Sequence, residues 1–134
     1  MKDNNTPMKL PTVAPTLRVI PMPSDTNAEG DIFGGWLLAQ MDLAGASLAY
    51  QVVANRIVTV GVDGMNFHKP VFVGDEVSFY STVRKTGRTS ISIHVEAWAR
   101  QRHKPDEVRR VTEGLFTYVA LDENRKPTEI KKHD

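Results

Sequence analysis

The sequence predicts an α+β domain in which one long helix is wrapped by an antiparallel sheet. Apolar residues lie on nearly every side of a helical stretch at 33–53, and a helix of that kind is normally buried. Beyond this stretch the apolar period changes from helical to strand-like, and short turns join the strands. Consecutive strands joined by short turns form an antiparallel sheet, and a single apolar helix must pack against it.

The elements follow in order along the chain. A first strand is expected at 13–20, although Pro15 favours an edge position or a late start. Turn-forming residues fill the loop at 21–31, which leads into the helix. The remaining strands are predicted by alternating apolar residues at 56–67, 76–85, 91–100 and 108–121.

Size and composition narrow the possibilities. With 134 residues the chain is one domain, which we assign to residues 13–125, with flexible tails at 1–12 and 126–134. The absence of cysteine excludes disulfides, thiolate metal sites and a cysteine nucleophile, and the four histidines lack metal-ligand spacing. A net charge of +1 lacks the excess of positive charge that is typical of nucleic-acid-binding proteins. No apolar run has the length of a membrane span or the pattern of a signal peptide. We therefore expect a cytoplasmic protein without a nucleic-acid or membrane partner.

Oligomerisation is expected as well. The predicted strands are long and partly apolar on both faces, so a single domain would leave much apolar surface in water. Continuation of the sheet into a second copy, or packing against one, would cover that surface.

An acid on the apolar helix is the first candidate for chemistry. One face of the helix carries Ala39, Asp42, Ala46 and Ala49, with Gly45 beside them. A buried carboxylate must be paired, neutralised or used, and the small side chains around it leave room for a ligand. A carboxylate hydrogen-bonded within the core, or one facing a dimer contact, would fit the same pattern.

Two further motifs admit both a functional and a structural interpretation. Gly34 and Gly35 begin the helix, where free backbone N–H groups and the helix dipole suit an anion or oxyanion, although glycines also simply permit a tight turn. The cluster Arg84, Lys85 and Arg88 is either a solvated hairpin or a clamp for phosphates. No nucleotide-binding glycine motif and no GxSxG serine-hydrolase motif is present.

A family resemblance rests on a long block of sequence. Residues 22–36, followed by Gln40-Met41-Asp42, closely resemble the hotdog-fold acyl-CoA thioesterases of the bacterial YciA type, which are related to the brain acyl-CoA hydrolases of animals. The likeness continues through the segments 65–70, 73–75, 87–90 and 116–120, and it covers roughly residues 17 to 122.

This resemblance implies a hotdog fold, a sheet shared by two protomers, and commonly a homohexamer built as a trimer of dimers. It implies that Asp42 is catalytic, that Asn27 (otherwise a turn former or helix cap) assists, and that amides of Gly34 and Gly35 polarise the thioester carbonyl. The active site would be shared across the dimer. The expected coenzyme A contacts are Thr59, Asn66, Arg84, Lys85, Gly87, Arg88, Thr89 and Ser90.

The two lines of reasoning predict an acyl-CoA thioester hydrolase of fatty acid metabolism. Fatty or short acyl-CoA would yield the free acid and CoA, with Asp42 as general base or as nucleophile. We expect no metal and no cofactor, because coenzyme A is part of the substrate. A non-catalytic acyl-CoA sensor is the alternative, whereas a hotdog dehydratase would need a catalytic histidine, and none lies on the helix.

Overall fold

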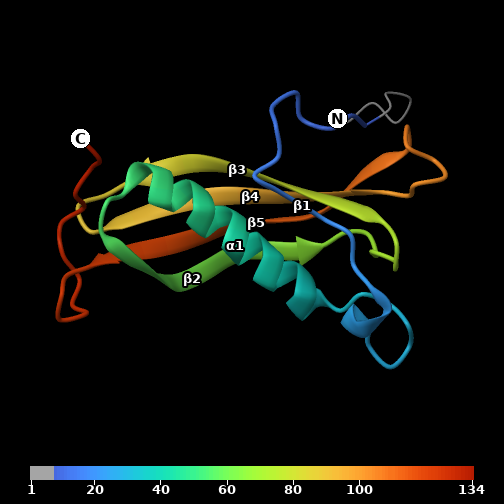
Figure 1. Ribbon diagram of the computed structural model, residues 1–134, viewed down its shortest axis with the longest axis horizontal. Helices are drawn as coiled ribbons and strands as arrows, with labels where there is room; N and C mark the ends of the chain where they lie inside the picture. Colours follow the sequence, from blue (N-terminus) through green and yellow to red (C-terminus); the bar gives the residue numbers. More distant parts are fainter. Residues whose placement is uncertain (1–7) are drawn as a thin grey trace.

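One helix lies across one face of a five-stranded antiparallel sheet (Figure 1). The computed structural model describes residues 8–134. The helix α1 spans Gly34–Val52, and a short 3-10 helix, Pro23–Asp25, precedes it. The strands are β1 (Leu17–Val19), β2 (Arg56–Phe67), β3 (Glu76–Thr86), β4 (Ser90–Arg100) and β5 (Val108–Leu121), in the spatial order β1-β3-β4-β5-β2. The predicted α+β class is confirmed.

The first strand is shorter than the sequence pattern indicated. It was expected at 13–20, but pairing with β3 covers only Leu17–Val19. Proline has no N–H to donate, so Pro15 cannot extend the ladder. The first backbone bond to the sheet comes from the N–H of Thr16, which donates to the carbonyl of Phe79 at 2.8 Å.

The hydrophobic core lies between α1 and the inner face of the sheet. Five alternate residues of β4, from Ile91 to Ala99, are at most 1% exposed, so the alternating apolar residues that predicted this strand form its inward face. From the helix, Leu37, Met41 and Ala44 pack against this face. The inward-facing residues of the strand and one apolar stripe of the helix therefore pack together in the same buried layer.

The helix is not buried on every side, which corrects the expectation drawn from its apolar sequence. Leu38, Leu43 and Tyr50 are 39%, 61% and 51% exposed. The sheet lies against one side of α1, so the opposite side faces outward among the described residues (Figure 1). Among residues 8–134, no helix is both long and apolar enough to cross a membrane.

The edge strand β2 carries a second exposed apolar surface. Val58, Val60 and Val62 are 42%, 57% and 38% exposed. Among residues 8–134, β2 pairs in the sheet with β5 alone, so its other edge lies at the border of the sheet. Apolar side chains on an unpaired edge are a natural surface for pairing with another chain.

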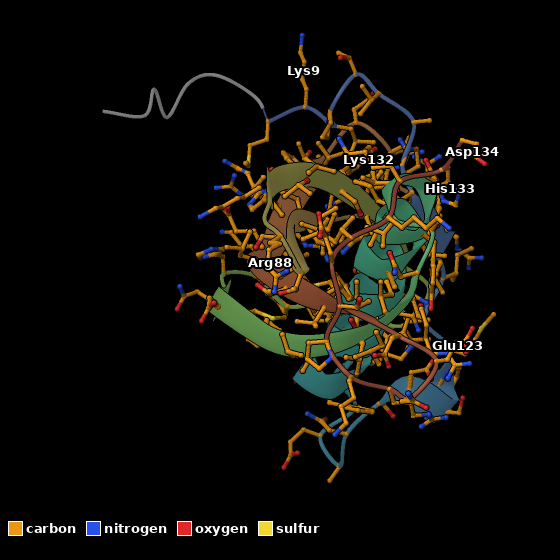
Figure 2. The ribbon with its side chains drawn as sticks, turned by 90° about the vertical axis from the view of Figure 1, so that its left-hand side faces the viewer. Lys9, Arg88, Glu123, Lys132, His133 and Asp134 are labelled. Atoms are coloured by element: carbon orange, nitrogen blue, oxygen red, sulfur yellow. The ribbon has the colours of Figure 1, made fainter. Side chains whose placement is uncertain are left out.

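Residues 126–134, which the sequence analysis assigned to a flexible tail, make backbone hydrogen bonds to the domain. The N–H of Ile130 donates to the carbonyl of Arg88 at 2.8 Å, and the N–H of Ala54 donates to that of Lys131 at 2.7 Å. Figure 2 looks onto this end of the molecule, where Arg88, Lys132 and His133 are labelled. Of the other predicted tail, residues 1–7 lie outside the described part of the chain.

Candidate active site

Asp42 lies in the middle of α1 and is held by hydroxyl groups from two neighbouring strands. Its Oδ1 accepts hydrogen bonds from Thr59 Oγ1 at 2.8 Å and from the Tyr118 hydroxyl at 3.0 Å. Thr59 of β2 and Tyr118 of β5 are register partners, so the sheet presents both hydroxyls side by side. The carboxylate is half-buried and has no cationic partner among residues 8–134.

Tyr118 is a site residue to which the sequence analysis assigned no role. It is 1% exposed, and its hydroxyl also donates to the backbone carbonyl of Asp42 at 2.9 Å. Burial raises the pKa of the Tyr118 hydroxyl above its usual 10.0, and the charge of Asp42 and the hydrogen bond to it raise the pKa further. The hydroxyl therefore stays protonated near neutral pH and acts as a hydrogen-bond donor.

A mostly apolar cavity of about 310 Å³ opens beside this carboxylate. It is lined by Gly35, Leu38, Ala39, Asp42, Thr59, Val62 and Phe116. Clefts of about this size, with apolar walls and few polar groups, are typical of small-molecule sites. A larger hollow of about 520 Å³ lies beside Glu76, but that carboxylate is paired with Arg100 at 2.8 Å.

The start of α1 presents free backbone donors. Phe33 is the N-cap and gives no side-chain cap, and the first turn holds no acidic residue. Within residues 8–134, no acceptor is bonded to the N–H groups of Gly34 or Gly35, as expected at a helix start. Asp42 follows Gly35 by two turns, which places their backbone atoms about 10 Å apart along the axis.

Asn27 lies in the exposed loop before α1 and organises a turn. Its Oδ1 accepts the N–H groups of Glu29 at 2.9 Å and Asp31 at 3.1 Å. It does not line the cavity beside Asp42 within one chain. The turn-forming interpretation thus describes its contacts here, while the assisting role stays a prediction.

The residues predicted to bind coenzyme A lie at three places, and one of these residues, Thr59, is bonded to Asp42. Arg84, Lys85, Gly87, Arg88, Thr89 and Ser90 surround the exposed β3–β4 hairpin, near the C-terminal end of α1 (Figure 1). Asn66 lies near the far end of β2, about 20 Å along the strand from Thr59. One chain therefore does not bring all eight residues together, and their role stays a prediction.

No metal centre is evident in the part of the chain that the structure describes. No group of three or more His, Cys, Asp or Glu side chains gathers there in a way that could hold a metal ion.

A long helix laid over a five-stranded antiparallel sheet is the arrangement of a hotdog-fold domain. The sequence profile described as the thioesterase superfamily matches residues 29–105. The chain belongs to that superfamily.

Individual relatives agree with this assignment. The acyl-CoA thioester hydrolase YciA of Salmonella typhimurium is 52% identical over 113 residues, which cover 83% of this chain and 85% of that protein. Two solved structures are similar over nearly the whole chain. A hexameric thioesterase of Yersinia pestis has a TM-score of 0.85 and 48% identity, covering 92% of this chain and 100% of its own. A hexameric hotdog-fold thioesterase of Campylobacter jejuni has a TM-score of 0.82 and 43% identity, covering 89% and 91%.

Proposed function

We propose that the protein is an acyl-CoA thioester hydrolase with Asp42 at its reacting centre. The observation that carries the proposal is a half-buried carboxylate at the wall of an apolar cavity that also reaches Gly35 at the start of α1. A thioester needs an activated oxygen nucleophile and donors for the developing oxyanion. The similarity to the YciA hydrolase of Salmonella typhimurium supports the choice of acyl-CoA as substrate.

In the proposed reaction, Asp42 takes a proton from water while the water oxygen attacks the thioester carbonyl carbon. The carbonyl oxygen becomes an oxyanion, to which the N–H groups of Gly34 and Gly35 donate. The intermediate collapses by breaking the C–S bond, and the leaving thiolate recovers the proton from Asp42. General-base catalysis contributes about 10²–10⁴-fold, and each oxyanion donor about 10²–10³-fold.

Direct attack by the carboxylate is the second route that the sequence left open. It would form a mixed anhydride between the acyl group and Asp42. Rapid quenching followed by intact-protein mass spectrometry detects such an adduct. We favour the general base. A water molecule is small and can bridge the distance between the Asp42 carboxylate and the thioester carbonyl carbon. The acyl carbon then need not come within bonding distance of the helix side chain.

Binding of coenzyme A is assigned to the basic hairpin. Arg84, Lys85 and Arg88 are exposed there, and charge-assisted hydrogen bonds from such side chains suit phosphate oxygens. These contacts contribute affinity rather than chemistry, because the phosphates lie far from the thioester. Asn27 is proposed to hold the water or the carbonyl through its amide N–H₂, since its Oδ1 is used within the turn.

The proposed assembly is a homohexamer built as a trimer of dimers. A second copy that pairs along the free edge of β2 would cover the exposed Val58 and Val60. Thr59 and Val62 of the same strand line the cavity, so this pairing would also place a partner chain at its mouth. The active site would then be shared between protomers, which allows the second copy to supply Asn27 or the glycine amides.

The proposal is tested by following release of free CoA from a series of esters, from acetyl-CoA to palmitoyl-CoA, with purified protein. We expect turnover of at least one ester far above the spontaneous rate. An acyl-CoA sensor would bind an ester in a calorimetric titration and release no thiol. Tight binding without thiol release for every ester would therefore replace the hydrolase with the sensor.

A further inference from the structure

We propose that the Tyr118 hydroxyl, seated in the space left by Gly45, is a positioning device that aims the Asp42 carboxylate at the cavity. This inference rests on the proposed hydrolase function and adds two residues to its machinery. It assigns Tyr118 no contact with substrate.

The hydrogen bonds around Asp42 divide the two carboxylate oxygens into different roles. Oδ1 receives both hydroxyl donors, from Thr59 and from Tyr118. Within residues 8–134, no protein donor bonds to Oδ2. Every buried side-chain nitrogen or oxygen of the described residues has a partner, so Oδ2 is not sealed in the core. The remaining oxygen is thus the one that is open to water.

The Tyr118 hydroxyl fixes the side chain relative to its own helix. It lies 2.9 Å from the backbone carbonyl oxygen of Asp42 and 3.0 Å from Oδ1. A single proton shared by these two acceptors ties the carboxylate to the helix backbone. Because the Tyr118 ring is fully buried in the core, this anchor is rigid, which is what a reacting carboxylate requires.

Gly45 makes the anchor sterically possible. It follows Asp42 by three residues and lies on the same face of α1. A Cβ at Gly45 would overlap the Tyr118 hydroxyl oxygen, whereas the nearest ring carbons would lie at 3.2 and 3.3 Å. The absence of a side chain at Gly45 therefore leaves space for the hydroxyl group in particular. If residue 45 carried a Cβ and residue 118 had no hydroxyl, the ring would need to move by only a few tenths of an ångström.

The steric relation provides a test with two independent substitutions. Tyr118→Phe removes the hydroxyl and keeps the ring, and Gly45→Ala displaces the hydroxyl and keeps the tyrosine. Each should lower kcat at least about tenfold, the factor expected when a hydrogen bond to a charged group is lost, with KM unchanged within about twofold.

The double variant distinguishes positioning from general damage. With the hydroxyl absent, the added methyl group meets only the ring, so Gly45→Ala in the Tyr118→Phe background should cost little further kcat. Tyr50→Phe, on the exposed side of the same helix, is the matched control and should leave kcat unchanged. Thermal unfolding and assembly size are measured for each variant alongside kcat.

Wild-type kcat in Tyr118→Phe, or kcat losses that multiply in the double variant, would overturn the inference. If Tyr118→Phe fails to fold, Gly45→Ala alone decides, because unchanged kcat there is equally contradictory. Asp42→Asn separates failure of the positioning role of Tyr118 from failure of the proposed role of Asp42. An inactive Asp42→Asn with a fully active Tyr118→Phe defeats only the positioning role, whereas an active Asp42→Asn defeats the proposed role of Asp42 itself.

Discussion

Replacing Arg109 with methionine should destabilise the fold far more than most single substitutions do. Arg109 donates to the carboxylate of Asp75, whose side chain is 3% exposed, and to the carbonyl of Pro70 at 3.1 Å. Without the guanidinium, the Asp75 carboxylate keeps one hydrogen bond from the described residues, donated by the N–H of Phe72 at 3.0 Å. Loss of one partner of a buried ion pair costs about 3–5 kcal/mol, because the remaining charge stays desolvated.

Urea unfolding at a fixed protein concentration measures this cost. Arg110→Met is the matched control, because the adjacent Arg110 is more exposed and pairs with Glu113 at 3.3 Å. Such a pair contributes about 0–1 kcal/mol. Replacing Asp75 by leucine together with Arg109→Met should recover much of the loss. Equal, small losses for Arg109→Met and Arg110→Met would refute the reasoning.

Three further predictions concern pH, substrate affinity and assembly. The hydrogen bond from His94 to Glu113, helped by the nearby positive charges, holds the Glu113 pKa below 4.5. The stabilisation is therefore present above about pH 4.5 and lost as pH falls through the folded-state pKa, and His94→Leu should return the Glu113 NMR titration toward 4.5. Arg88→Gln should raise KM for acyl-CoA about three- to tenfold without changing kcat, and the rise in KM should be smaller at high salt. Arg102→Gln, in the distant polar loop, should leave KM unchanged. Val60→Asp should give a smaller assembly by light scattering, because it places a charge on the exposed edge strand.

Most of the fold could be predicted because its signals are local. The predicted strands at 56–67 and 108–121 have the bounds of β2 and β5, and the predicted helix differs from α1 by one residue at each end. Alternation and helical periodicity are properties of short windows of sequence. The exposed side of α1 could not be predicted in the same way, since it depends on how much of the helix the sheet reaches.

The candidate site shows the same division between local and distant information. The small side chains around Asp42 single it out, because they occur within three turns of one helix. Its contact with Tyr118 joins residues 76 positions apart, and the place of Thr59 beside Tyr118 depends on the register of β2 and β5. That register is set by packing across the sheet and cannot be read from either strand alone. The reason for a glycine at position 45 likewise becomes clear only from the structure, which places the Tyr118 hydroxyl beside it.

The turnover of Asp42→Asn, compared with wild type on the best acyl-CoA ester, tests the central claim most directly. Asparagine keeps the shape of the side chain and cannot accept the proton of water, so kcat should fall at least about a hundredfold with KM little changed. Asp63→Asn, at an exposed aspartate of β2, should keep normal kcat. Near-normal kcat in Asp42→Asn would contradict the account.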